Sequence, residues 1–204
     1  VDEGVRRNQG RTGAAAGPTA LRERFLRLCP DPENLEEFSL LIRSSRDLGD
    51  IECSGDLAQD QQALGSCVSA QLEAGSLVVI LGGGHETGYG HFLAYARRGK
   101  PVAIQNFDAH ADVRPLRDGH GHSGSPFRQA LTHPSGCCTD YQVAGLQPSA
   151  TAADHLEFLR ANRAGWTWRE DTDRPCIDSA FAGDLGPRMA TFCLDAVDQA
   201  FAPG

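Results

Sequence analysis

Apolar residues along the chain gather in short continuous runs that are separated by segments with helical spacing. The runs have the length and composition of buried strands and occur at 39–43, 77–81, 101–107, 141–146, 166–168 and 190–194. Segments whose apolar residues recur three or four positions apart, or that lie between proline and glycine boundaries, are predicted to be helices at 18–29, 56–75, 87–98, 125–131 and 149–163. Residues 1–17 follow neither period, which predicts a loop.

The alternation of strands and helices predicts a parallel α/β sheet with helices on both faces. The chain has 204 residues and contains no internal repeat and no linker long enough to divide it. We therefore expect a single domain over residues 1–204. Reactive side chains in such a sheet collect beyond the carboxyl ends of the strands.

The charge balance excludes several classes of function. Lys and Arg number 19 against 27 Asp and Glu, a net charge of −8, which disfavours binding to nucleic acid or to an anionic membrane surface. No apolar run approaches the roughly 18 residues of a membrane span.

The seven cysteines are scattered along the chain, which is typical of reduced thiols in the cytoplasm. Because the chain starts at Val1 and its single methionine is Met189, we expect a processed product or a fragment.

Histidine or aspartate follows three of the predicted strands. The sequences at these strand ends are Gly82-Gly83-Gly84-His85-Glu86, Asp108-Ala109-His110-Ala111-Asp112 and Asp195-Ala196-Val197-Asp198. In Asp108-x-His110-x-Asp112, alternate side chains of an extended backbone share one face, so the carboxylates and the imidazole can converge on one point. His85 and Asp195 are expected at the same edge of the sheet.

Carboxylate and imidazole ligands suit Mn²⁺ better than Zn²⁺ or Fe²⁺. Five or six such ligands exceed the needs of one ion, which predicts a two-metal site. Taken alone, Asp-x-His-x-Asp is more typical of a solvated polar loop, but the matching positions of His85 and Asp195 favour the metal site. The glycines 82–84 are either an ordinary turn or the room that lets His85 approach the ions.

The same motifs resemble those of the ureohydrolase family, which comprises arginases, agmatinases and formimidoylglutamases. Arginases and agmatinases usually carry Asp immediately before the first metal-binding histidine, where this chain has Gly84. Gly84 and the segment 123–129 are most similar to the formimidoylglutamase branch. The residues that carry the resemblance are 82–86, 106–112 and Ser123-Gly124-Ser125-Pro126-Phe127-Arg128-Gln129, with shorter stretches at 4–8, 17–18 and 47–50.

The resemblance implies a three-layer α/β/α fold with a mostly parallel sheet, incomplete here at both termini, and a binuclear Mn²⁺ site. His85, Asp108 and Asp112 would hold one ion. His110, Asp108 and Asp195 would hold the other, with Asp108 as the bridge. The implied reaction is hydrolysis of the amidine C–N bond of N-formimidoyl-L-glutamate to glutamate and formamide, a step of histidine breakdown, by a hydroxide held between the ions. Asp112 and His110 are the expected catalytic residues, and Asp112 would pass a proton to the leaving amine.

Two features depart from the family pattern. Family members carry Asp-x-Asp at the last metal-binding strand, and here Cys193 replaces the first Asp while Asp195 is retained. The chain also ends at Gly204, inside that family motif. We therefore expect the second ion to bind weakly, and a non-catalytic homologue or an inactive fragment is an alternative of a different class.

The expected substrate is a small molecule whose carboxylate requires a basic partner. Arg128 or Arg114 would pair with that carboxylate through two parallel hydrogen bonds, and Ser123 and Ser125 are further candidate substrate-binding residues. Within the family, the alternative substrates are agmatine or a guanidino acid. Cationic agmatine would require acidic partners instead. A homo-oligomer is compatible with the sequence.

Overall fold

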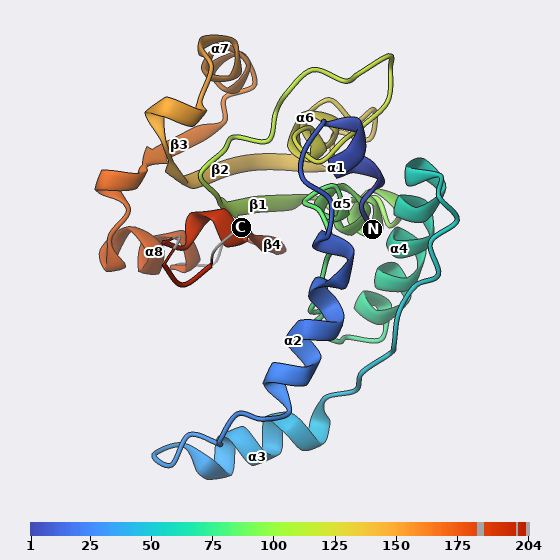
Figure 1. Cartoon of the computed structure of the whole chain (residues 1–204), viewed down its shortest axis with the longest axis vertical. Coiled ribbons are helices and arrows are strands. Elements are labelled where there is room, and N and C mark those ends of the chain that lie inside the picture. The colour runs from blue at the N-terminus through green and yellow to red at the C-terminus, as the bar shows by residue number, and fades with distance from the viewer. Residues whose placement is uncertain (183–185, 199, 203–204) are drawn as a thin grey trace.

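The computed structural model describes residues 1–182, 186–198 and 200–202 (Figure 1). Its α-helices are α1 Glu3–Arg7, α2 Gly17–Phe25, α3 Leu35–Ser44, α4 Leu57–Glu73, α5 Thr87–Arg97, α6 Pro126–Leu131, α7 Ala153–Ala161 and α8 Arg174–Phe181. Its strands are β1 Val102–Phe107, β2 Cys138–Leu146, β3 Gly165–Trp168 and β4 Arg188–Phe192. Single 3₁₀ turns form η1 Ala14–Ala16, η2 Pro148–Ala150, η3 Arg169–Asp171 and η4 Leu194–Ala196.

The strands form one parallel sheet in the order β3-β2-β1-β4. β1 lies between β2 and β4, and β4 is reached from β3 by a crossover that contains α8. The predicted parallel α/β sheet is therefore confirmed. The carboxyl ends of β1 and β4 are adjacent, since Phe107 pairs with Phe192.

Helices cover both faces of the sheet. On one face, α6 and α7 bury Phe127 and Leu159 against Tyr141 of β2 in the main hydrophobic core. On the other face, α8 places Phe181 against Phe107 of β1, with the two rings stacked at 5.9 Å. In Figure 1, α6 and α8 lie on opposite sides of the sheet. This layered arrangement agrees with the expected α/β/α architecture.

The boundaries of α4 follow from its end residues. The Asp56 carboxylate accepts hydrogen bonds from the first-turn amides of Ala58 and Gln59, which satisfies donors that the helix itself cannot. Gly75 follows the helix at a φ of +78°, where a residue with a side chain would be strained. The predicted helix over 56–75 is confirmed, and α5, β1, α6, β2, α7, β3 and β4 also match predicted elements.

Three sequence predictions are wrong. Residues 39–43 lie within helix α3, because an apolar run of that length does not distinguish a strand from a helix. Residues 77–81 form no strand. Leu77 is 91% exposed and Val79 is 76% exposed, since this run lies outside the four-stranded sheet of the described residues and its apolar side chains have no face to cover. The predicted loop over residues 1–17 contains α1 and the start of α2.

None of the helices in the described part of the chain combines the length and the apolar character that crossing a bilayer demands.

Candidate metal centre

The candidate metal centre lies at the carboxyl edge of β1 and β4. The amide of Cys193 donates to the carbonyl of Phe107 at 2.9 Å, so the chain segments that leave the two strands run side by side. Asp108 follows β1 directly, and Asp195 follows β4 after two residues, on η4. The structure thus brings together side chains that are 87 positions apart in sequence, as expected for adjacent parallel strands.

His85 reaches this edge from a different element than expected. It lies in the turn that leads into α5, and no strand precedes it. Its Nδ1 atom is 2.9 Å from Oδ2 of Asp108 and 2.9 Å from Oδ2 of Asp112. The edge of its ring packs against Phe127, with the ring centres 5.2 Å apart. The position of His85 is therefore set by the helix α5 that follows it and by the core residue beneath it.

The candidate ligands fall into two groups. His85, Asp108 and Cys193 form one group, and Asp108, His110 and Asp195 form the other. Within each group, one donor atom from every residue lies within 4.8 Å of the others. Asp108 belongs to both groups, as a bridging carboxylate would have to, whereas Asp112 belongs to neither group.

The contacts of His85 fit a cation-binding role. Both of its ring nitrogens are buried and have no hydrogen-bond partner among the described residues, although two carboxylates lie beside Nδ1. Buried polar atoms are rarely left without a partner. A buried imidazole that shares a small space with two carboxylates is the arrangement expected of side chains directed at a common ion. Imidazole nitrogens and carboxylate oxygens are donors that divalent transition ions accept.

Opposite charges at this edge stabilise one another. Burial disfavours the charge of Asp108, but the adjacent imidazoles of His110 and His85 outweigh it and lower the pKa of Asp108. Asp108 and Asp195 raise the pKa of His110 to about 10, and His110 Nδ1 lies 2.9 Å from Oδ2 of Asp195. Burial and the charge of Asp108 raise the pKa of Asp112 to about 6. A cluster of this charge is stable only with cationic partners.

Two local features of the backbone hold these side chains. Asp112 has a φ of +48°, a conformation that is uncommon and strained for a residue with a side chain. Its carbonyl accepts a hydrogen bond from the amide of Phe127 at 3.2 Å, which ties the loop after β1 to α6. The amide of His110 donates to Oδ1 of Asp108 at 2.8 Å. The loop therefore turns sharply enough for Asp108 and Asp112 to face the same imidazole.

A buried hydrogen-bond network supports Asp108 from below, and sequence reasoning did not identify it. Thr191 donates to the amide oxygen of Asn106 at 2.7 Å, and the Asn106 amide nitrogen donates to the Tyr141 hydroxyl at 3.1 Å and to Asp108 at 3.4 Å. The Tyr141 hydroxyl donates to the carbonyl of Ala111 at 2.8 Å. The signal in the sequence was Asn106, one of two polar residues in the strand Val102–Phe107.

Arg114 and Ser123 lie together on the loop between β1 and α6. The amide of Arg114 donates to the carbonyl of Gly124 at 2.8 Å, and its guanidinium donates to the side chain of Asn8 at 3.2 Å. The Asn8 side chain donates in turn to the Ser123 hydroxyl at 3.0 Å. Arg114 and Ser123 therefore face the N-terminal part of the chain as well as the loop.

Ser125 ends this loop and Arg128 lies in the helix α6 that follows it, and the side chains of both contact the loop. Ser125 is fully buried, and its hydroxyl exchanges hydrogen bonds with the backbone of His122. The role of Ser125 in substrate binding stays a prediction from the sequence. Arg128 donates to the carbonyl of Val113 at 2.7 Å and packs over the ring of Phe158 at 3.8 Å. These contacts give Arg128 a role in holding the loop.

The glycines 82–84 leave space for Thr87, Val1 and Glu86, and not for the approach of His85 to the ions. A Cβ atom at Gly82 would collide with Thr87, and one at Gly83 would collide with the backbone of Val1. A Cβ atom at Gly84 would collide with the carboxylate of Glu86. The space is therefore filled by the N-terminus and by Glu86. The approach of His85 to its neighbours does not depend on it.

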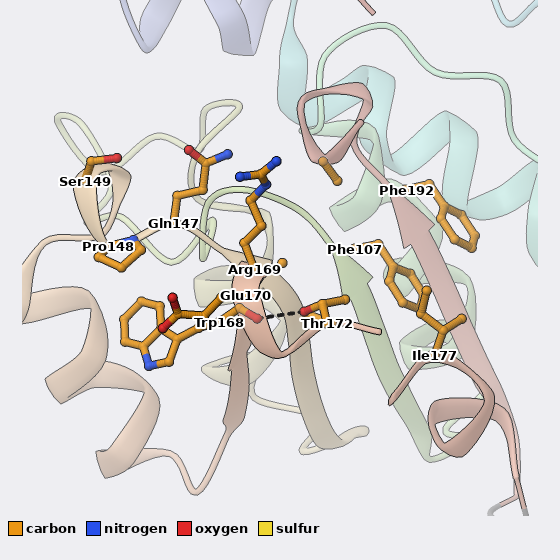
Figure 2. A pocket seen from close by; sticks show the side chains of 13 residues that line it. Phe107, Gln147, Pro148, Ser149, Trp168, Arg169, Glu170, Thr172, Ile177 and Phe192 are labelled. Carbon is orange, nitrogen blue, oxygen red and sulfur yellow. Dashed lines mark hydrogen bonds between the residues drawn. The ribbon is translucent and has the colours of Figure 1, made fainter. Parts of the chain in front are cut away.

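A cavity of about 670 Å³ opens beside the centre at the carboxyl edge of the sheet (Figure 2). Its lining begins one residue from two candidate ligands, at Phe107 and at Ala196. Figure 2 shows an apolar wall that includes Phe107 and, across the cavity, the polar side chains of Gln147 and Arg169 pointing in one direction. A small molecule with apolar and polar parts fits such a cavity.

A parallel α/β sheet whose carboxyl edge gathers histidines and aspartates into two groups with a shared carboxylate is typical of hydrolases that use a pair of divalent ions. The profile of the Arginase family matches residues 2–204. The chain belongs to the Arginase family.

Within the family, the chain is similar to curated formimidoylglutamases. The formimidoylglutamase of Chromobacterium violaceum is 39% identical over 203 residues, which covers 98% of this chain and 61% of the relative. The formimidoylglutamase of Nocardia farcinica is 40% identical over 216 residues, which covers all of this chain and 64% of the relative. The chain thus spans a little over three-fifths of the length of these curated relatives.

Solved structures of formiminoglutamase and arginase superpose on this chain. The formiminoglutamase of Trypanosoma cruzi with Mn²⁺ superposes with a TM-score of 0.81 at 29% identity, covering 98% of this chain and 69% of that chain. An arginase from Bacillus subtilis superposes with a TM-score of 0.75 at 21% identity, covering all of this chain and 75% of that chain. The expected arginase-like α/β fold is confirmed.

Proposed function

We propose that the protein to which this chain belongs hydrolyses N-formimidoyl-L-glutamate to L-glutamate and formamide. The formimidoylglutamases of Chromobacterium violaceum and Nocardia farcinica support this choice within the family. In the reaction, water adds to the amidine carbon, the C–N bond to glutamate breaks, and the glutamate nitrogen leaves as an amine after receiving a proton.

The identity of 39% to 40% with these two enzymes carries the proposal, and basic side chains near the candidate metal centre agree with it. Burial lowers the pKa of His155, and the positive charges of Arg114, Arg128 and His110 lower it further, against the opposite effect of Asp154. These basic groups therefore lie close enough to act on one another. Basic side chains favour a substrate with free carboxylates over cationic agmatine.

We propose that the cofactor is a pair of Mn²⁺ ions. His85, Asp108 and Asp112 would hold one ion, with the Cys193 sulfur beside them, and Asp108, His110 and Asp195 would hold the other. The unpartnered nitrogens of His85 and the two converging groups of donors support this assignment, as does the presence of Mn²⁺ in the formiminoglutamase of Trypanosoma cruzi. Bound ions would supply an activated water at neutral pH and polarise the amidine.

The residues of the chain supply positions and protons. Asp108 orients both imidazoles, since its two oxygens contact His85 and His110 separately. A carboxylate oxygen of Asp112 would accept the proton of the attacking water and return it to the leaving nitrogen. Arg114, with Ser123 beside it, would hold a glutamate carboxylate. The cavity next to Ala196 would take the remainder of the substrate.

We propose a cytoplasmic location, which the cysteines support. All seven are free thiols, as in proteins from reducing compartments. A small-molecule substrate fits the cavity, and a homo-oligomer stays a prediction from the sequence.

The test is metal content and turnover of the full-length protein. We expect Mn²⁺ to be retained after dialysis, and hydrolysis of N-formimidoyl-L-glutamate to exceed hydrolysis of agmatine by about a hundredfold or more, because a site built for a charged group rejects substrates that lack it. Guanidinobutyrate, which has one carboxylate where N-formimidoyl-L-glutamate has two, should also be hydrolysed more slowly. Equal turnover of agmatine would show that the substrate assignment is wrong. Retained metal without turnover of any of the three would identify a non-catalytic homologue.

The carboxylate partner can be assigned by exchanging each arginine for lysine. In the full-length protein, we expect Arg114→Lys to raise KM for N-formimidoyl-L-glutamate about tenfold, because an ammonium group cannot form the two parallel hydrogen bonds of a guanidinium. Arg128→Lys is the matched control and is expected to change KM less than threefold, since Arg128 is already engaged by Val113 and Phe158. A larger effect from Arg128→Lys would move the assignment to Arg128, and no effect from either would place the carboxylate elsewhere.

A further inference from the structure

Glu86 is a buried carboxylic acid that none of the steps above uses. It immediately precedes α5, is 0% exposed and directly follows His85. Its Oε1 atom accepts a hydrogen bond from the amide of Gly4 at 3.0 Å, across 82 positions of sequence. Its Oε2 atom has no hydrogen-bond partner among the described residues. A carboxylate buried with one oxygen unpaired lowers stability, so its presence calls for a positive reason.

The chain around Glu86 is shaped to accommodate its carboxylate. A Cβ atom at Gly4 or at Gly84 would collide with the Glu86 side chain. The amide of Gly84 also donates to the carbonyl of Val1 at 3.1 Å. Residues 1–8, here named the N-terminal segment, are thereby fixed to the turn that carries His85.

The opposite side of the N-terminal segment contacts the loop between β1 and α6. The carbonyl of Gly4 accepts a hydrogen bond from the amide of Ser123 at 3.1 Å. Gly4 therefore bonds to Glu86 through its amide and to Ser123 through its carbonyl. Asn8 contacts both Ser123 and Arg114 with its side chain, at 3.0 and 3.2 Å.

Two arginines extend this contact. Arg7 donates to the carbonyl of Gly121 at 2.6 Å, and Arg117 donates to the carbonyl of Arg7 at 3.0 Å. The N-terminal segment is therefore the layer between the turn of His85 and the loop that bears the proposed carboxylate-binding residues. The distance between these two parts of the site is set through it.

We propose that Glu86 is a positioning residue for substrate binding. Its buried carboxylate fixes the amide of Gly4, and the N-terminal segment then holds Ser123 and Arg114 at the distance from His85 that the substrate requires. The inference rests on the proposed function for the identity of the substrate. The role of Glu86 in fixing the N-terminal segment does not depend on it.

The test uses Glu86→Ala and Glu86→Gln in the full-length protein. We expect Glu86→Ala to raise KM for N-formimidoyl-L-glutamate at least fivefold while kcat changes less than twofold, because the carboxylate-binding side moves and the reacting centre stays in place. Trypsin cleavage after Arg6 and Arg7 should accelerate about tenfold, since the N-terminal segment loses its anchor. Glu86→Gln keeps an oxygen that accepts from Gly4, and we expect it to restore most of both properties.

A double-mutant comparison locates the effect at the contact itself. Gly4→Ala should accelerate trypsin cleavage in the wild-type background, where the added methyl collides with Glu86, and should add little in the Glu86→Ala background. If Glu86→Ala does not fold, the cleavage rates and KM values of Gly4→Ala and Glu86→Gln are compared with those of the wild type instead. An effect of Gly4→Ala that is equal in both backgrounds would overturn the proposal.

Asp60 provides the matched control. It is also a buried carboxylic acid with one unpaired oxygen, and its other oxygen accepts from Ser54 within the same region of the chain. Asp60→Ala should lower the melting temperature and leave both KM and cleavage at Arg7 unchanged. A Glu86→Ala variant that behaves like Asp60→Ala, or that lowers kcat with KM constant, would overturn the positioning role. Absence of turnover in the wild type would reject the proposed function, and the cleavage rates would still decide whether Glu86 fixes the N-terminal segment.

Discussion

Replacing Asp108 with asparagine in the full-length protein is expected to abolish metal binding at both groups of candidate ligands. Asp108 belongs to each group, and its two oxygens face different histidines. Asparagine keeps the shape but removes the negative charge and one accepting oxygen. We expect turnover to fall by about a thousandfold or more, a loss of about 4 kcal/mol in transition-state stabilisation.

Without metal, Asp108→Asn is expected to lower the melting temperature. Against the effect of burial, the imidazoles of His110 and His85 lower the pKa of Asp108 in the folded protein, so its charge contributes stability at neutral pH that asparagine loses, and the relief of repulsion with Asp112 offsets only part of that loss. Mn²⁺ should raise the melting temperature of the wild type by binding only the folded state, and it should leave that of Asp108→Asn unchanged. Asp140→Asn, at an exposed aspartate of β2, is the control. Retention of two ions by Asp108→Asn would contradict the bridging assignment.

The sequence predicted the residues of the candidate centre better than the elements that carry them. Asp108 and Asp195 follow strands that pair with each other, and that placement follows directly from a parallel sheet. His85 was expected after a strand at 77–81, yet it lies in the turn before α5 and still reaches Asp108. The helix α5 and the contact with Phe127 fix it there.

What the sequence could not reveal was set by contacts between distant segments. An isolated run of apolar residues gives no information about its neighbours, and so 77–81 was predicted to be a strand although the sheet of the described residues does not include it. Glu86 is next to His85 in sequence, but its partner Gly4 is 82 positions away. Tyr141 and Thr191 support Asp108 through Asn106 from two different strands. Such networks become visible only when the strands are placed side by side.

The effect of Cys193 on metal binding decides between the proposed function and the alternative of an inactive homologue. Its position matches that of a metal ligand, because its sulfur lies within 4.8 Å of donor atoms of His85 and Asp108. Its backbone is held by Phe107 at the end of β1, and burial raises the pKa of its thiol to about 11. The position of Cys193 therefore suits either a small packed residue at the end of β4 or a metal ligand.

We expect Cys193→Asp to increase both Mn²⁺ occupancy and activity. A thiol offers a single soft donor, which favours Zn²⁺ over Mn²⁺, whereas a carboxylate offers two hard oxygens and a negative charge to offset the ions. The wild-type full-length protein should bind one Mn²⁺ tightly and the second weakly. Cys193→Asp should approach two ions per chain and raise kcat/KM about tenfold, a gain of about 1.4 kcal/mol in transition-state stabilisation.

Two further measurements identify the cause of that gain. Cys193→Ser removes the soft donor without adding charge, so it should weaken Zn²⁺ binding and leave the second Mn²⁺ weak. Without metal, Cys193→Asp should melt at a lower temperature than the wild type, because a third carboxylate then lies beside Asp108 and Asp195, and Mn²⁺ should more than restore the difference. Wild-type protein that already holds two tightly bound Mn²⁺ ions and gains nothing from Cys193→Asp would show that Cys193 is a packed residue and that the second ion is held by other ligands.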